Sequence, residues 1–151
     1  MIKLLVRGIP VAHPYTLTRK TEAVSRTTYD GWVQLIRRSA VHQLGPHHIP
    51  LDGLVVLSAR IHASGWETLP ICDLGKAIVE ALTGIGYYSP TQVSKLLIDK
   101  RPPMTRAERQ GSAIAEGAFI MVWPAAEVEE AFLEAVAELQ RGQDGAGGSA
   151  P

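Results

Sequence analysis

The chain has 151 residues, of which 46% are hydrophobic and 20% charged, and its mean hydropathy is +0.05. These values are typical of one globular domain, which buries roughly two thirds of its unfolded surface without needing a metal or disulfides. The single cysteine excludes a disulfide within the chain, and no apolar run approaches the ~20 residues of a membrane-spanning helix, so we expect a cytoplasmic protein without a membrane partner.

The formal net charge is zero, but the charges are unevenly distributed along the chain. Residues 1–110 hold 14 of the 15 Lys and Arg and 8 of the 15 Asp and Glu, whereas residues 111–151 hold one Arg and seven acidic residues. The longer part is therefore basic and the end is acidic. A basic surface of this size is compatible with a phosphate-bearing partner such as nucleic acid, and also with many metabolic enzymes.

The first predicted elements are a buried strand at residues 1–8 and a polar connection at residues 9–27. Three cations, Arg19, Lys20 and Arg26, lie in this connection. Long basic loops in compact domains are often functional, so we expect this one to contact the backbone of a ligand.

A helix is predicted from residue 28 to the Gly45-Pro46 pair, which ends it. Its apolar residues recur at the spacing of an amphipathic stripe. The stripe consists of Tyr29, Trp32, Val33, Ile36 and Ala40.

Three more strands and a second helix are predicted in the remainder of the domain. Residues 54–63 form the second strand, because they are rich in Val, Leu and Ile. Apolar residues at helical spacing predict the second helix at residues 71–82. The third and fourth strands are predicted at residues 93–100 and 117–123, with a polar connection at residues 101–111 after the third.

The end of the chain is predicted to be an acidic helix followed by a disordered tail. Residues 124–141 have apolar positions at helical spacing among five glutamates, and residues 142–151 are rich in Gly, Ala and Ser. The expected fold is a single α/β (α+β) domain over residues 1–123, with a mixed four-stranded sheet packed by helices and an extra C-terminal helix.

Residues 69–93 read LPICDLGKAIVEALTGIGYYSPTQV, an Ala-containing helix that leads through a glycine and an aromatic residue into a strand. This order resembles the central signature of the RusA family of Holliday junction resolvases, and the resemblance extends over residues 1–123. With one residue fewer in the turn, the matching positions are Lys76, Ala77, Ala81, Leu82, Gly86, Tyr87, Gln92 and Val93. The resemblance implies a homodimer from a bacterium or phage that binds branched DNA.

The positions at which RusA-like nucleases hold Mg²⁺ carry no carboxylate in this chain. They are occupied by Pro70 and Cys72 before the lysine and by Ser89 and Pro90 in the turn. Mg²⁺ requires hard oxygen ligands, and one or two carboxylates are its usual minimum from a protein. The resemblance therefore favours a catalytically degenerate resolvase that still binds branched DNA and needs no cofactor.

Binding of this kind depends on cations that contact phosphates. The candidates are Arg19, Lys20, Arg26, Lys76, Lys100, Arg101 and Arg106. Lys76 has an equally simple alternative role, because it is spaced i,i+4 from Glu80 and the two side chains would then form a solvated ion pair.

An active Mg²⁺-dependent endonuclease with relocated acids is a second hypothesis. Asp73 would be its metal ligand, helped by Glu67 or Glu80, and Lys76 would assist catalysis at the scissile phosphate. Asp73 also suits the first turn of a helix, where an acid complements the helix dipole. Cleavage that disappears in Asp73→Asn would support this hypothesis.

A third hypothesis makes the chain a protein-interaction or regulatory module. The acidic helix at residues 124–141 would then bind a protein partner or cover a basic surface. Packing of this amphipathic helix on the sheet is the structural alternative.

Overall fold

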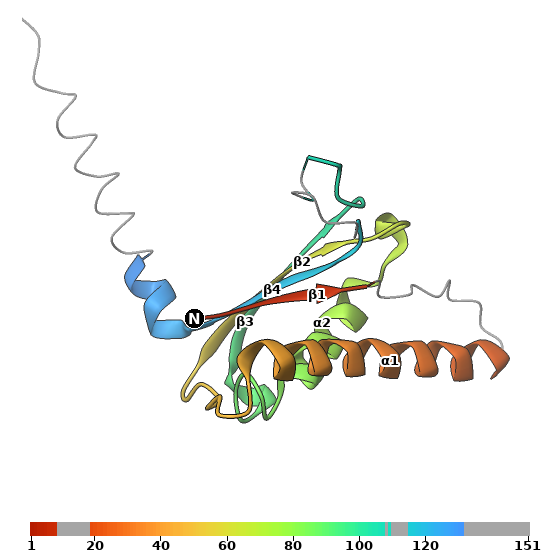
Figure 1. Ribbon diagram of the computed structural model, residues 1–151. Helices are drawn as coiled ribbons and strands as arrows, with labels where there is room; N and C mark the ends of the chain where they lie inside the picture. The colour runs from red at the N-terminus through yellow and green to blue at the C-terminus, as the bar shows by residue number, and fades with distance from the viewer. Residues whose placement is uncertain (9–18, 108, 110–114, 132–151) are drawn as a thin grey trace, which may run out of the picture.

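The computed structural model describes residues 1–8, 19–107, 109 and 115–131, with the side chains of residues 19–28 outside this description (Figure 1). The elements form one small α+β domain. They are β1 (Ile2–Arg7), α1 (Arg19–Leu44), β2 (Val55–His62), α2 (Ile71–Leu82), β3 (Val93–Arg101) and β4 (Gly117–Pro124). Short 3₁₀ helices at Trp66–Thr68 and Pro90–Gln92 precede α2 and β3.

The sheet is four-stranded and mixed, as predicted, with the strand order β1-β4-β2-β3. β2 and β3 are parallel, which is possible because α2 provides the crossover between them, whereas β4 is antiparallel to both of its neighbours. β4, the last strand of the sheet in sequence, thus pairs between β1 and β2.

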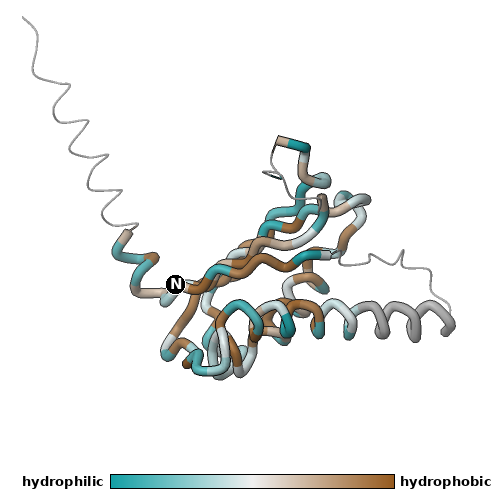
Figure 2. The backbone as a smooth tube through the Cα atoms, in the orientation of Figure 1, coloured by the Kyte–Doolittle hydropathy of each residue, from teal (hydrophilic) through white to brown (hydrophobic). Residues whose placement is uncertain are grey.

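Both long helices cover the same face of the sheet (Figure 1). β1 shows the consequence, because Ile2, Leu4 and Val6 are buried and the residues between them are exposed. Its prediction as a buried strand is therefore right for one face only. In Figure 2 hydrophobic residues follow the strands and recur along α1, where the predicted stripe packs against the sheet. The opposite face of the sheet carries neither of these helices.

The start of α1 corrects the sequence analysis, which placed residues 19–27 in a loop. The helix begins at Arg19, nine residues before the predicted start. Residues 19–28 lack an apolar stripe, so periodicity does not identify them, but their Arg, Lys, Glu and Ala residues favour a helix and Glu22 is spaced i,i+4 from Arg26. The remainder of the predicted connection, residues 9–18, lies outside the described residues.

A glycine allows α2 to pack closely on the sheet. A Cβ atom at Gly75 would lie 2.8 Å from Leu96 Cδ2 and 3.1 Å from Ile98 Cδ1. Any larger residue would therefore move the helix away from β3 or displace these side chains.

The side chain of Gln43 covers the outer edge of β1. Its Oε1 accepts a hydrogen bond from the Leu5 N–H at 2.9 Å, and its Nε2 donates to the Leu5 carbonyl at 2.8 Å. The amide thus pairs with the backbone of this edge strand as a neighbouring strand would, so the Leu5 N–H and carbonyl have partners within the chain.

β4 ends at Pro124, and residues 125–131 are helical. The predicted helix includes Pro124 in its first turn, but Pro124 pairs with Val55 in the sheet. Glu127 lies 3.9 Å from the amino group of Met1. The rest of the predicted helix and the predicted disordered tail lie outside the described residues. Among the described helices, none has the length and apolar composition needed to cross a membrane.

Candidate nucleic-acid interface

The carboxyl ends of three strands lie at the same end of the sheet. β1, β2 and β3 run in one direction, because β1 and β2 are both antiparallel to β4 and β3 is parallel to β2. Their last residues, Arg7, His62 and Arg101, therefore lie in one row with Gly117 of β4. The fold therefore brings the guanidinium groups of Arg7 and Arg101 to the same end of the sheet, although the two residues are far apart in the sequence.

Lys100, a predicted phosphate contact, interacts with the backbone of the segment that precedes α2. Its Nζ donates hydrogen bonds to the carbonyl of Leu69 at 2.8 Å and to that of Glu67 at 3.3 Å. The ammonium group thus connects the end of β3 to the start of α2. Two of its three donors are occupied within the protein.

Arg101, the next residue, points to the opposite face of the sheet, because successive residues of a strand alternate between faces. Its Nε lies 3.0 Å from both carboxylate oxygens of Asp99, and Arg60 Nε lies 3.1 Å from Oδ2 of the same residue. The hydrogen bond from Arg101, followed by that from Arg60, lowers the pKa of the Asp99 carboxyl group. Exposed pairs of this kind contribute little stability, but the shared carboxylate orients both guanidinium groups.

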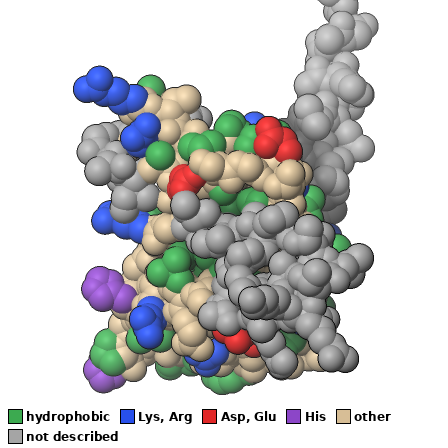
Figure 3. Space-filling model, turned by 90° about the vertical axis from the view of Figure 1, so that its right-hand side faces the viewer, with side chains coloured by type: hydrophobic (Ala, Val, Ile, Leu, Met, Phe, Trp, Pro, Cys, Tyr) green, Lys and Arg blue, Asp and Glu red, His purple; other side chains and the backbone are tan. Residues whose placement is uncertain are grey.

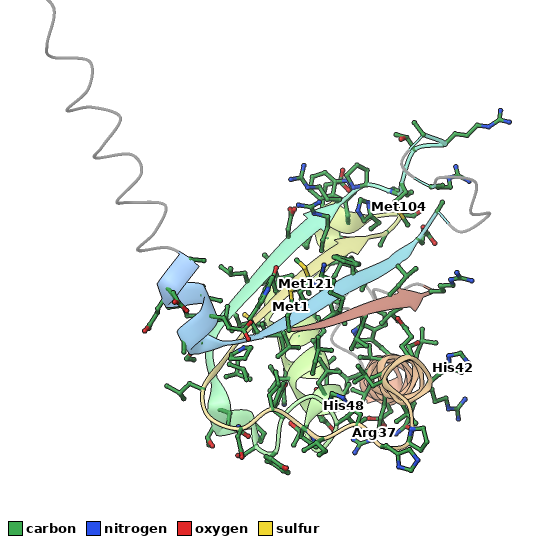
Figure 4. The ribbon with its side chains drawn as sticks, turned by 60° about the vertical axis from the view of Figure 1, so that its left-hand side comes forward. Met1, Arg37, His42, His48, Met104 and Met121 are labelled. Atoms are coloured by element: carbon green, nitrogen blue, oxygen red, sulfur yellow. The ribbon has the colours of Figure 1, made fainter. Side chains whose placement is uncertain are left out.

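We call the sheet face opposite α1 and α2 the open face. In strand register it consists of Lys3, Leu5, Arg7, Gly117, Phe119, Met121, Trp123, Val56, Ser58, Arg60, His62, Lys95, Leu97, Asp99 and Arg101. It carries five Lys and Arg side chains but a single acid, Asp99. Figure 4 labels Met121, which belongs to the open face, on the sheet, and Arg37 on α1. The open face is therefore strongly cationic, although the whole chain is neutral.

Lys76 lies on the other side of the molecule, at an open cavity of about 590 Å³ beside α2. Arg37, Glu80 and Thr83 also line this cavity, and Arg37 Nη2 donates to the Thr83 carbonyl at 3.5 Å. Glu80 accepts a hydrogen bond from the Tyr29 hydroxyl at 2.8 Å. In the described part of the chain the predicted Lys76–Glu80 ion pair is absent, since no contact within 4.0 Å joins the two side chains.

The remaining predicted cations lie on two other segments. Arg19, Lys20 and Arg26 are on the first turns of α1, where only the backbone is described. Arg106 is exposed in the segment that follows β3. Figure 3 shows Lys, Arg and His side chains along the left-hand edge of that view, beside the grey atoms. The predicted contacts thus form no single cluster among the described side chains.

The positions at which the resemblance to RusA-like nucleases predicts metal ligands form two groups along the chain, one at the start of α2 and one after its end. Pro70 precedes the first residue of α2 and Cys72 is in its first turn, whereas Ser89 follows the C-terminal end of the helix. The two groups are therefore separated along the chain by the remainder of α2. Among the described residues, no group of three or more His, Cys, Asp or Glu side chains is placed to hold a metal ion.

Asp73, the proposed relocated ligand, faces α1. It is half-buried, and its charge contributes to the raised pKa of Tyr29 on that helix. The proposed helper Glu80 accepts the Tyr29 hydroxyl hydrogen bond, and Glu67 is exposed before α2. Asp73 and Glu80 thus both act on Tyr29, whereas Glu67 lies before the helix.

Two tyrosines, Tyr29 on α1 and Tyr87 after α2, make the stability of the folded protein depend on pH. Burial is the main cause that raises the pKa of Tyr87 above its ordinary value of 10.0, and its hydroxyl donates to the Val79 carbonyl at 2.9 Å. Burial and the hydrogen bond to Glu80 likewise raise the pKa of Tyr29. Above about pH 10 the unfolded chain loses these protons while the folded protein retains them, so the free energy of unfolding should fall as the pH rises.

The urea midpoint should therefore decrease between about pH 9 and about pH 11, and it should decrease less in Tyr87→Phe. Lysine deprotonation affects both proteins equally, so the difference between the two curves isolates Tyr87. Parallel curves would contradict the assigned role of the Tyr87 hydroxyl.

No known protein-family model matches this sequence, and comparison with curated proteins yields no significant match.

Sequence reasoning missed most of the open face. Lys3, Arg60 and Phe119 were not among the candidate residues, although the period-two pattern of β1 and β4 places them opposite the buried residues. That pattern was obscured because Leu5 and Phe119 are apolar on the exposed face. Strict alternation of apolar residues with Lys or Arg would have been the signal.

Proposed function

We propose that this protein binds branched DNA, such as a four-way junction, in the cytosol and does not cleave it. The observation that carries the proposal is the separation of charges in the fold. Five Lys and Arg side chains with one acid occupy the open face, whereas no three His, Cys, Asp or Glu side chains of the described residues are placed to hold a metal ion. Phosphate binding requires clustered cations of this kind, whereas metal-dependent hydrolysis requires acids that converge on a metal ion.

The resemblance of residues 69–93 to the RusA signature supports a branched substrate and a homodimer. Two copies related by a twofold axis would present two cationic surfaces to a substrate whose four arms have the same symmetry. Binding would then need no Mg²⁺ cofactor.

The test is a gel experiment with a synthetic four-way junction and a duplex of the same sequence, each with the protein in Mg²⁺, Mn²⁺ or EDTA. We expect the junction to be retarded more strongly than the duplex in all three buffers, with no product on a denaturing gel. Symmetric nicks that disappear in Asp73→Asn would establish an active enzyme instead. No retardation of either DNA would refute DNA binding and favour the protein-interaction hypothesis.

The first turns of α1 provide a more specific prediction. Replacing Arg19 and Lys20 together by alanine should weaken junction binding and reduce the slope of log K against log [salt] by about 2, because each lost phosphate contact removes ~0.9. The matched control replaces Arg37 and Arg38 on the same helix, which changes the charge equally. An equal loss of slope in both variants would show that only total charge matters.

A further inference from the structure

The centre of the open face is an aromatic ring presented to solvent. Phe119 of β4 is 39% exposed, and in strand register it lies between Leu5 of β1, 42% exposed, and Arg60 of β2. β4 is an inner strand of the sheet. A flat ring and an apolar neighbour therefore occupy the middle of the face.

Cations flank this apolar centre on both sides. Lys3 and Arg7 extend from one edge strand, β1, and Lys95 and Arg101 from the other, β3. Neighbouring strands are about 4.8 Å apart, so the two rows of cations are roughly 14 Å apart. The five Lys and Arg side chains and Asp99 give the open face a formal charge of four positive units.

This charge argues against a second copy of the chain as the occupant. Two open faces packed against each other would bring equal positive charges together, and like charges in an interface oppose association. An anionic partner is attracted by the positive charge of the open face. The exposed apolar centre adds a second requirement, which is a partner with flat apolar surfaces as well as negative charge.

An unpaired DNA strand satisfies both requirements, whereas a duplex satisfies only one. In a duplex the base faces are stacked on each other and only the backbone would meet the sheet, so Phe119 and Leu5 would face phosphates. In an unpaired strand the phosphates and the base faces are both available, and bases stack on aromatic side chains with little dependence on sequence.

We propose that the open face binds an unpaired DNA strand, with a base stacked on Phe119 and phosphates contacted by Arg60 and the cations of the edge strands. This inference rests on the proposed function, since unpaired nucleotides occur where a junction opens at its crossover. The hydrogen bonds from Arg60 and Arg101 to Asp99 hold the two guanidinium groups on this face before the strand binds.

The experiment measures fluorescence anisotropy of a labelled oligothymidylate of about 20 nucleotides and of a duplex of the same length, titrated with the full chain. The wild-type protein should bind the oligothymidylate more tightly than the duplex. Phe119→Ala should weaken oligothymidylate binding about 5- to 100-fold and leave duplex binding unchanged. Tyr88→Ala is the matched control, because Tyr88 is 53% exposed in the turn before β3 and lies off the open face.

Two further variants separate stacking from folding. Phe119→Trp should retain oligothymidylate binding and add a tryptophan signal that the stacked base quenches, whereas Phe119→Leu should lose binding while it remains folded by circular dichroism. If Phe119→Ala itself fails to fold, this pair decides the question. Equal binding by Phe119→Trp and Phe119→Leu would overturn the proposal.

The failures of the two proposals are distinguishable. Junction binding by the wild-type protein with unchanged oligothymidylate affinity in Phe119→Ala would refute the role of the open face and leave the proposed function intact. No binding of junction, duplex or oligothymidylate would refute both. A dimer in sedimentation velocity that Phe119→Ala converts to monomer would show that the open face joins two copies, which would also overturn the inference.

Discussion

Replacing Gly117 by alanine should destabilise the protein by about 2–3 kcal/mol. A Cβ atom at this position, the first residue of β4, would overlap the backbone carbonyl oxygen of Val6 on the neighbouring strand. The carbonyl belongs to the backbone of β1, so it cannot turn away as the end of a flexible side chain would. Either the two strands separate at this end or the ladder loses its register.

Urea unfolding followed by circular dichroism measures this effect, and Gly31→Ala is the control. Gly31 lies exposed within α1, and a Cβ there would have no neighbour within 4 Å. Alanine is favoured over glycine within a helix, so this control should stabilise the protein by about 0.5–1 kcal/mol. Opposite signs for the two replacements are expected. An unchanged stability of Gly117→Ala would contradict the close approach of β1 and β4.

Replacing Gln92 by alanine should cost about 2–4 kcal/mol, since its side chain makes four hydrogen bonds. Its Oε1 accepts from the N–H groups of Tyr88 and Ser89, both at 2.8 Å. Its Nε2 donates to the carbonyls of Leu51 at 3.1 Å and Gly53 at 2.7 Å. This single amide therefore connects the segment before β2 to the turn before β3, and its loss leaves four backbone groups without their partner.

The measurement is again the free energy of unfolding, together with amide hydrogen exchange at Tyr88 and Ser89, which should become faster. Gln92→Glu should be nearly as destabilising, because a carboxylate cannot donate to the two carbonyls. Gln34→Ala is the control on α1, where the glutamine is exposed, and it should change stability by less than about 0.5 kcal/mol. Slow exchange at Tyr88 and Ser89 in Gln92→Ala would contradict the role assigned to this side chain.

The position of Gln92 also bears on the resemblance to the RusA family. Gln92 and Tyr87 were matched to the family signature, and both have structural roles here, one joining two segments and the other buried with its hydroxyl bonded to the Val79 carbonyl. Residues with structural roles of this kind do not by themselves indicate an activity. The proposed function therefore depends on cations such as Arg60 and Lys3, which the signature does not include.

Local patterns in the sequence were sufficient to predict most elements of this fold. The helix at Ile71–Leu82 was predicted with its exact bounds, and the four strands were predicted to within one or two residues. These segments pack against the sheet or lie in it, so burial imposes a visible period on their apolar residues. The first turns of α1 were missed, because they extend away from that packing and carry no such period.

The candidate site was less predictable, because its geometry depends on residues far apart in the chain. The i,i+4 spacing indicated that Lys76 would meet Glu80, but Tyr29, 51 residues from Glu80, donates to that carboxylate. The sequence likewise could not show that Lys100 would bind the backbone before α2 while Arg101 faces solvent. Alternation places the two residues on opposite faces, but it does not say which face the helices cover.

The sequence by itself determined the order of strands and helices, the neutral total charge and the identity of Pro70, Cys72, Ser89 and Pro90, none of which is a carboxylate. These properties follow from residue type and from short-range spacing alone. Only the tertiary structure decided that α1 and α2 cover the same face, so that Phe119, Arg60 and Lys3 come together on the other. The period of the apolar residues shows that one face of each element is buried, but the face of the sheet that the helices cover depends on contacts between segments far apart in the chain.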